Sequence, residues 1–271
     1  MCTVLIGRDV TGPGEILIAA NRDENPARPS DPPGVLLDAP RLVGGRDRVA
    51  GGTWLAVRAP TPDAGRAKAE AGSKAEAGSK PEAGCNVTML LNRRPLPGAP
   101  VPARSRGLLV IDVARAADPR AAAHAEAASG RYGPCTLLHA SSRSCWWLAI
   151  PGDGPVRGGD IAPGWHAITH AELDDANEPR TAWLIEKLAD LDERGVESAL
   201  ARLASLLAHH GDATSPAVCL HEGRMPTVSA ALIALTRGRA IYRHAEGRPC
   251  TQPFVDVSSL LRADRKSDEA P

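Results

Sequence analysis

The sequence has few aromatic residues, no excess of charge and no long apolar run. Phenylalanine, tyrosine and tryptophan make up 3% of its 271 residues, while alanine and arginine are abundant, which we interpret as the compositional bias of a bacterial genome. The formal net charge is zero, so neither a basic surface for nucleic acid nor an acidic tail is indicated. No apolar stretch is long enough to span a bilayer, and the N-terminus shows no charged-then-apolar leader. We therefore expect a cytoplasmic protein that binds neither nucleic acid nor membranes.

A C-x-x-C pair is also absent. The cysteines are spread along the chain, at Cys2, Cys85, Cys135, Cys145, Cys219 and Cys250. Without a secretion signal, they are interpreted as free thiols. His166 and His170 have the i, i+4 spacing of a helical metal site, but their segment reads as extended, and His209, His210 and His221 have no spacing partner. We therefore expect no metal site.

The length and composition are compatible with one domain. A chain of 271 residues with 43% hydrophobic content can bury one sizeable core. The clearest interruption is the segment 61–84, in which Ala-Glu-Ala-Gly-Ser-Lys occurs twice. This segment has no apolar face, so burial cannot offset the entropy of ordering it. We expect a single domain over residues 1–261, with a flexible insert at 61–84, and a disordered tail over 262–271.

The hydrophobic pattern predicts a mixed α+β chain. Short apolar runs between turn residues predict strands at 2–7, 16–20, 53–57, 86–91, 136–139, 145–150, 165–169, 216–220, 227–235 and 240–242, and a last strand before Val257. Residues 107–113 are interpreted as a strand or as the entry to a helix. Helices are predicted at 118–128, 179–191 and 196–209.

Cys2 follows the initiator methionine directly. Methionine aminopeptidases remove Met1 when the next residue is small, so the mature chain is expected to begin with a cysteine that carries both a thiol and a free α-amine. The ordinary pKa values of these groups are about 8.5 and about 8, so the amine can serve as the base for the thiol near neutral pH. The alternative is that Cys2 is only a small buried strand residue.

Four polar residues, Asn21-Arg22-Asp23-Glu24, end the second apolar run. A glycine- and proline-containing turn at 11–14 joins the first two runs, and antiparallel pairing would bring Cys2 near Asn21, Arg22 and Asp23. A cation beside the thiol lowers its pKa, and a carboxylate can hold the α-amine by a charge-assisted hydrogen bond. The alternative is a solvated turn with a surface ion pair of little energetic weight.

Several motifs in one order resemble the NRDE family, which includes transport and Golgi organization protein 2. They are Met1-Cys2-Thr3, Asn21-Arg22-Asp23-Glu24, Arg28-Pro29, Gly51-Gly52-Thr53-Trp54-Leu55, Leu90-Leu91-Asn92-Arg93 and Ser105-Arg106-Gly107. The family is similar to amino-terminal-nucleophile hydrolases. The resemblance therefore implies a four-layer αββα sandwich of two antiparallel sheets.

The resemblance also implies a reaction. Cys2 would attack the carbonyl carbon of a small amide to form a thioester, with Arg22 and Asp23 positioning the N-terminus. Asn92 would stabilise the oxyanion of the tetrahedral intermediate. The alternative, from local sequence alone, is an asparagine that satisfies a turn after a strand.

Other positions are expected to contact the substrate, and two depart from the family pattern. The expected contacts are Asn21, Glu24, Gly52, Thr53, Trp54 and His170; a glycine pair allows close backbone approach to a ligand but also makes an ordinary turn. His170 stands where related hydrolases carry asparagine, and Val228 where many carry arginine. These changes indicate a different substrate or lost turnover.

A competing function comes with the same resemblance. Some relatives have a proposed role in haem trafficking, for which Cys2 or a histidine would be an axial ligand. The chain has no C-x-x-C-H attachment motif, so haem would be bound loosely. For the enzyme, we expect a small-molecule substrate and no cofactor. The third alternative is an inactive hydrolase relative that acts through protein contacts.

Overall fold

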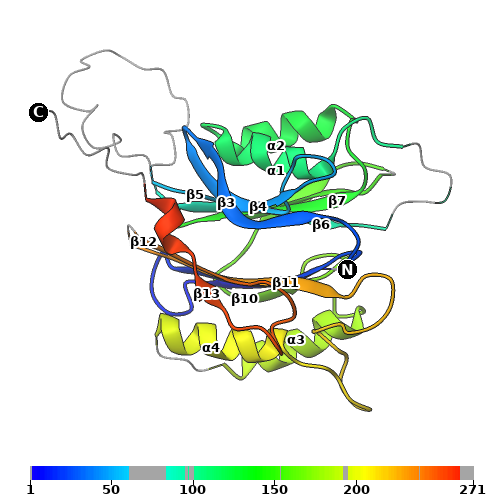
Figure 1. The fold of residues 1–271 in the computed structure, drawn as a ribbon, viewed down its shortest axis with the longest axis vertical. Helices are drawn as coiled ribbons and strands as arrows, with labels where there is room; N and C mark the ends of the chain where they lie inside the picture. Colours follow the sequence, from blue (N-terminus) through cyan, green and yellow to red (C-terminus); the bar gives the residue numbers. More distant parts are fainter. Residues whose placement is uncertain are drawn as a thin grey trace, which may run out of the picture.

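Two antiparallel β-sheets face each other, and helices cover their outer faces (Figure 1). The structure is a computed structural model, and it describes residues 2–60, 84–94, 97, 101–152, 154–191, 195–237 and 239–262. The predicted insert and tail lie outside the described residues, apart from Gly84 and Arg262. The expected α+β class is confirmed.

The first sheet contains the N-terminal strand. Among the described residues its strand order is β10-β1-β2-β11-β12-β13, with all neighbours antiparallel. The bounds are Thr3–Arg8 for β1, Ile16–Asp23 for β2, Gly164–Ile168 for β10, Thr227–Thr236 for β11, Arg239–Ala245 for β12 and Val255–Asp256 for β13. The predicted hairpin of the first two runs is confirmed, because β1 pairs with β2.

The second sheet has the order β3-β4-β5-β6-β7-β8-β9 within the described part of the chain. The bounds are Ser30–Asp38 for β3, Arg41–Asp47 for β4, Leu55–Arg58 for β5, Asn86–Asn92 for β6, Cys135–Ser141 for β7, Cys145–Ile150 for β8 and Arg157–Asp160 for β9. Sequence analysis did not find β3, because Pro32 and Pro33 lie within it. Proline is tolerated there because β3 is an edge strand, and its register shifts next to the prolines.

The helices form two separate layers. Helices α1 (Arg106–Arg115) and α2 (Pro119–Ala128) cover the sheet of β3–β9, and α3 (Pro179–Ala189) and α4 (Val196–Leu207) cover the other sheet (Figure 1). Side chains alternate along β1, so that Val4 and Ile6 join the core between the sheets while Leu5 packs under α3 and α4. No helix among the described residues is both long and apolar enough to cross a membrane.

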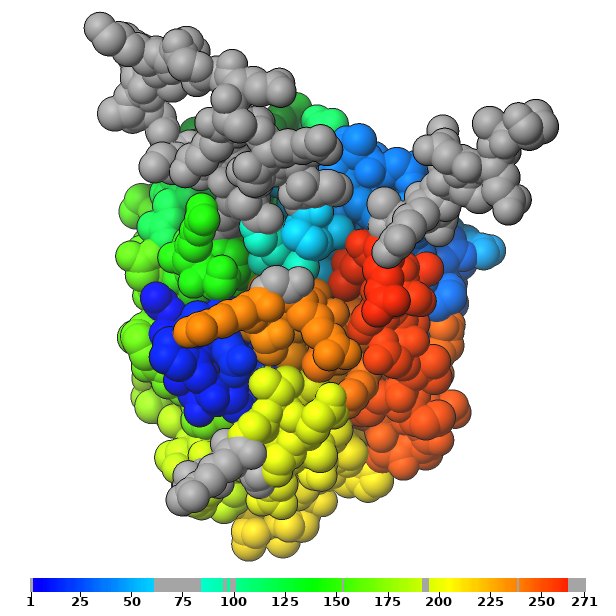
Figure 2. All heavy atoms as spheres, turned by 90° about the vertical axis from the view of Figure 1, so that its left-hand side faces the viewer, coloured from blue at the N-terminus to red at the C-terminus, as the bar shows by residue number. Residues whose placement is uncertain are grey.

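The short 3-10 helix η1 (Ser258–Leu261) lies at one end of the sandwich and contacts β4 and β12. Figure 2 looks at this end, where η1 (red) lies beside β12 (orange). The N-terminal residue of β1 lies at the other end (Figure 1). The candidate site is therefore at the end away from η1.

The structure decides one open sequence assignment and corrects another. Residues 106–115 form α1 and not a strand, because Ser105 caps the helix by accepting from the Gly107 N–H, and the buried residues Leu109, Val110 and Val113 lie on one helical face. Residues 216–220 form no strand; the backbone N–H groups of Val218 and Cys219 both donate to the carbonyl of His209 instead of to a neighbouring strand.

Candidate active site

The register of the first hairpin places Cys2 at the end of β2. Thr3 pairs with Asn21, so Cys2 comes next to Arg22 and Asp23, as the sequence predicted. Cys2 is partly exposed and packs against the core between the two sheets. The first residue of the predicted catalytic set therefore lies beside two of the others.

The Cys2 thiol is in an environment that disfavours its ionised form. Burial, followed by the charge of Asp23, raises its pKa to about 11, while a backbone hydrogen bond from Asp23 and the charge of Arg22 act in the opposite direction. A thiol with this pKa is almost wholly protonated at pH 7. Cys2 therefore needs a base before it can act as a nucleophile.

Asp23 is almost fully buried, with 3% of its surface exposed. Its Oδ1 accepts a hydrogen bond of 2.7 Å from the hydroxyl of Thr227, the residue that pairs with it on β11. Burial raises the pKa of Asp23, and the Thr227 hydrogen bond and the charge of Arg180 oppose that rise. The carboxyl is thus held in one place by a strand of the same sheet.

Arg180 is a site residue that sequence analysis missed. It lies in the first turn of α3 and donates from Nη1 to the hydroxyl of Thr3 at 3.3 Å. Its charge acts on both Asp23 and His170, so it connects α3 to the end of the hairpin. No local motif marks this arginine, because Thr3 and Asp23 are far from it in the sequence.

A cavity of about 280 Å³ lies beside Arg22, with walls from both sheets and from the start of α1. Charges of both signs line it, namely Arg22, Glu24, Arg28, Asp31, Arg46, Asp47, Arg106 and Glu246. A cavity of this size and polarity suits a small polar molecule.

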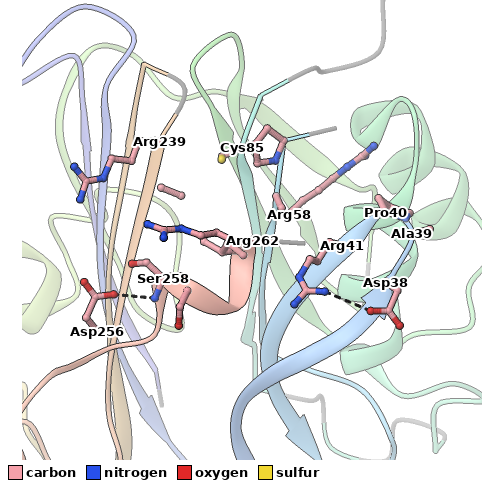
Figure 3. Close-up of a pocket in the computed structure, with 15 residues that line it drawn as sticks. Asp38, Ala39, Pro40, Arg41, Arg58, Cys85, Arg239, Asp256, Ser258 and Arg262 are labelled. Carbon is pink, nitrogen blue, oxygen red and sulfur yellow. Dashed lines mark hydrogen bonds and ion pairs between the residues drawn. The ribbon is translucent and has the colours of Figure 1, made fainter. Parts of the chain in front are cut away.

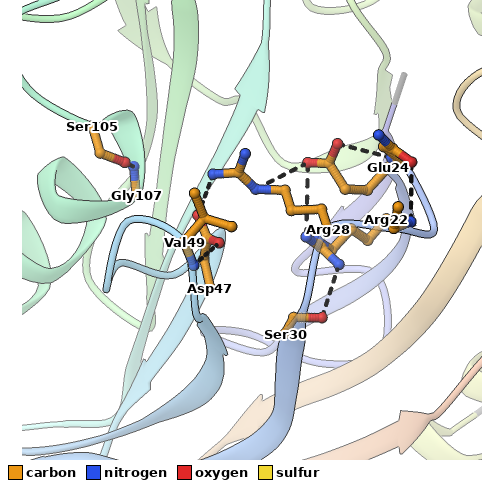
Figure 4. A network of polar contacts seen from close by, with 10 residues as sticks. Arg22, Glu24, Arg28, Ser30, Asp47, Val49, Ser105 and Gly107 are labelled. Carbon is orange, nitrogen blue, oxygen red and sulfur yellow. Dashed lines mark hydrogen bonds and ion pairs between the residues drawn. The ribbon is translucent and has the colours of Figure 1, made fainter.

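Two arginines of the cavity, Arg22 and Arg28, are held by a polar network (Figure 4). Arg22 donates to the Ser30 hydroxyl at 3.3 Å and pairs with Glu24 at 3.7 Å. Glu24 also reaches Arg28 at 4.0 Å, and Arg28 makes a 2.6 Å ion pair with Asp47. The network fixes the orientation of Arg22, whose side chain is only 10% exposed.

Five of the ten predicted site residues line this cavity. They are Arg22, Glu24, Thr53, Trp54 and Asn92. Asn92 is the exposed last residue of β6, so it reaches the cavity from the sheet opposite Arg22. Cys2 does not itself line the cavity, although its neighbour Arg22 does.

Asn21 and His170 lie elsewhere. Asn21 is completely buried, and its Nδ2 donates to the carbonyls of Leu207 and Val218 at 2.9 and 3.1 Å, so its amide anchors β2 to the α4 side of the sheet. His170 follows β10 and is half-buried. Burial, together with the charge of Arg180, lowers the pKa of His170, which favours a neutral imidazole at pH 7.

Gly52 supports the cavity wall and does not line it. A side chain at Gly52 would meet the backbone of Gly107 in α1, because an added Cβ would lie 2.3 Å from the Gly107 carbonyl carbon. The next residue, Thr53, donates its N–H to the Gly107 carbonyl at 3.0 Å. This close approach brings Thr53 and Trp54 against the start of α1.

We expect Gly52→Ala to destabilise the protein by about 1–3 kcal/mol, because two backbone segments must separate to admit the methyl group. Thermal unfolding would measure this effect. Gly34→Ala is the matched control, since an added Cβ at Gly34 has no atom within 4 Å. Equal melting temperatures for the two variants would contradict the proposed packing role of Gly52.

Two further residues line the cavity, Val228, which sequence analysis singled out as a departure from the family pattern, and His244, which it did not mention. Val228 is the extra residue of a β-bulge, because Thr227 pairs with Asp23 and Ser229 pairs with Arg22. It presents an apolar side chain to the cavity where the family resemblance implied an arginine. His244 also lines the cavity, and burial lowers its pKa to about 4, so that its imidazole is neutral at pH 7.

A second cavity, of about 970 Å³, lies at the other end of the sandwich. Arg41, Arg58, Arg239 and Arg262 line it (Figure 3). Cys85, just before β6, borders this cavity, whereas Asn92 at the end of β6 borders the smaller one, so the two cavities are about 20 Å apart along the strand. The larger cavity is therefore separate from Cys2 and Asp23.

A comparison with known protein families finds a match at the N-terminal end of the chain. The model of the family described as Transport and Golgi organisation 2 matches residues 1–66, which confirms the predicted resemblance over that segment. The matched segment includes Cys2, the tetrad that begins at Asn21, and the residues around Gly52, but neither Asn92 nor His170. No curated protein matches the chain.

Proposed function

We propose that this chain, which matches the Transport and Golgi organisation 2 family over residues 1–66, is a hydrolase that uses Cys2 as an N-terminal nucleophile to cleave a small amide. The observation that carries the proposal is the buried carboxyl of Asp23 beside Cys2, held by Thr227 and influenced by Arg180. The order of helices, sheet, sheet and helices supports an amino-terminal-nucleophile fold (Figure 1).

The first half of the reaction forms a thioester. Removal of Met1 leaves a free amine on Cys2, and this amine takes the thiol proton while Sγ attacks the carbonyl carbon of the substrate. Asn92 donates from its side-chain amide to the resulting oxyanion. When the carbonyl re-forms, the C–N bond breaks and the ammonium gives its proton to the leaving amine.

The second half consumes one water. The oxygen of the water attacks the thioester carbonyl while the α-amine takes a proton from the water. The ammonium then gives this proton to the departing sulfur. The products are a carboxylic acid, an amine and the free thiol. Asp23 holds the amine in position throughout, and Arg22 helps to position the N-terminus beside the cavity wall.

The proposal is tested by peptide mapping of the native protein after a limiting dose of a thiol electrophile. We expect an N-terminal peptide that lacks Met1, with Cys2 modified well ahead of Cys85, Cys135 and Cys145, because the amine can activate only its own thiol. Retention of Met1, or modification of Cys2 no faster than of Cys85, would overturn the mechanism. A Soret band on haem titration that is lost in Cys2→Ala, without amide turnover, would favour a carrier instead.

A further inference from the structure

Four potential metal ligands meet on the side of the first sheet that carries α3 and α4. They are His210, Cys219, His221 and Cys250, and their ligand atoms all lie within 4.8 Å of one another. Three of them come from the connection between α4 and β11, and Cys250 comes from the connection between β12 and β13. Sequence analysis expected no metal site because it found no C-x-x-C pair and no spacing partner for His210 or His221. The four ligands come together only in the fold, where Cys219 and Cys250 are 31 residues apart along the chain.

The distances in this cluster approach those of a tetrahedral site. The two Sγ atoms are 3.5 Å apart, and Nε2 of His221 lies 3.2 Å from Sγ of Cys250. Zinc bonds of about 2.3 Å to sulfur and about 2.0 Å to nitrogen give tetrahedral separations of about 3.8 Å between two sulfurs and about 3.5 Å between sulfur and nitrogen. The ring of His210 lies edge-on to that of His221, with 4.7 Å between centroids, and its ligand atom lies within 4.8 Å of those of the other three residues.

Backbone hydrogen bonds hold the ligands in place. The carbonyl of His209 accepts from the N–H of Cys219 at 2.8 Å, which fixes the His210 segment against the cysteine. The carbonyl of Arg248 accepts from Thr251 and Gln252, which makes the turn that presents Cys250. Arg248 also donates from Nη2 to the carbonyl of His221 at 3.4 Å. Such supporting contacts orient ligands in metal sites.

We propose that His210, Cys219, His221 and Cys250 bind one structural divalent metal ion of the zinc class. Four protein ligands close the coordination shell, which distinguishes a structural site from a catalytic one with an open position. Binding converts both thiols to thiolates, and the two protons go to solvent, so no oxidant or reductant is needed. A surface cavity of about 440 Å³ is lined by His210, Cys219 and His221 and gives an ion access from solvent.

The proposed metal would also stabilise the segment that supports Asp23. Leu220 lies between Cys219 and His221, and its N–H donates to the hydroxyl of Thr227 at 2.9 Å. Thr227 donates in turn to Asp23 at 2.7 Å. The ion would therefore clamp a loop that is two hydrogen bonds from the candidate catalytic carboxyl.

The first test uses the full-length chain, purified without chelators. We expect about one zinc ion per chain by elemental analysis. After zinc removal under reducing conditions, Co²⁺ should restore stoichiometric binding with the intense visible bands of a tetrahedral site and the near-ultraviolet bands of thiolate ligation. Two results would overturn the proposal. One is a zinc content below about a tenth of an equivalent together with octahedral cobalt spectra, and the other is a Cys219–Cys250 disulfide that persists after treatment with a reductant.

Variants identify the ligands. His210→Ala changes an exposed residue, so it should leave the fold intact and weaken Co²⁺ binding at least about tenfold. Cys219→Ser with Cys250→Ser should remove the thiolate bands. His124→Ala, on the exposed face of α2, and Cys85→Ser are matched controls that should bind as the unaltered chain does. Unchanged binding by the His210 variant and by the double cysteine variant would contradict the assignment.

Hydrogen exchange separates this role from the proposed hydrolase. We expect zinc removal to reduce protection of the amides in 209–226 and 248–252, while β6 in the other sheet keeps its protection. This readout needs no turnover, so the metal site can be established even if Cys2 proves inactive. Equal protection with and without zinc would overturn the clamping role.

Discussion

Replacing Cys2 with alanine is expected to abolish hydrolysis of small amides by the processed chain. The physical reason is that alanine leaves the α-amine in place but removes the sulfur, so no thioester can form. Removal of a catalytic nucleophile in other hydrolases costs up to about 10⁶ in rate. The measurement is turnover of a panel of small N-acyl amides, followed as amine release, on protein whose Met1 removal has been verified by mass spectrometry. A rate unchanged in Cys2→Ala would exclude Cys2 as the nucleophile.

Two matched variants make this result specific. Cys85→Ser changes a thiol that borders the distant larger cavity, so it should retain activity. Cys2→Ser replaces the sulfur with an oxygen nucleophile of similar size. This variant should retain at most a small fraction of the rate of amide hydrolysis. Acyl-enzyme accumulation, seen by mass spectrometry as a mass increase on the N-terminal peptide, should occur with Cys2 and be absent with alanine.

Asp23→Asn is expected to change activity and stability in opposite directions. Loss of the carboxylate removes the group that positions the α-amine, and a comparable change in a serine-protease triad costs about 10⁴ in rate. Burial raises the pKa of Asp23 in the folded protein, so its ionised form is disfavoured there. The asparagine variant should therefore be less active but more stable at neutral pH.

The effect of Asp23 on the stability of the folded protein depends on pH. A carboxyl with a raised folded pKa binds its proton more tightly in the folded than in the unfolded state. Its destabilising contribution is absent below the unfolded pKa of about 3.9 and grows as the pH rises towards the folded pKa. The melting temperatures of the parent and Asp23→Asn should thus differ least near pH ~3 and separate above pH ~4. A variant that is less stable than the parent at pH 7 would contradict this account of Asp23.

The local part of the site could be predicted because it depends on one hairpin. Cys2 and Asp23 lie at the ends of strands that are joined by a short turn, and alternation along those strands determines which side chains share a face. Most strands and α2, α3 and α4 were found for the same reason, since their periodicity or caps are local signals. The segment of helix α1 was left open between a strand and the entry to a helix, because its start is a continuous apolar run, which periodicity alone does not assign.

The remaining part of the site depends on long-range packing. Arg180 reaches Thr3 from a helix 177 residues away, and Val228 enters the cavity through a β-bulge. His244 becomes a cavity residue with a low pKa only because the two sheets bury it. No local pattern encodes these contacts.

The sequence by itself determined the α+β class, the first hairpin and the placement of Cys2 beside Arg22 and Asp23. These features follow from local periodicity, turn residues and strand alternation. Only the tertiary structure decided which residues share the charged cavity, which groups hold Asp23, and that two cysteines and two histidines from separate connections meet. The reason is that these arrangements are set by how two sheets and their helices pack, which brings together side chains that are distant along the chain.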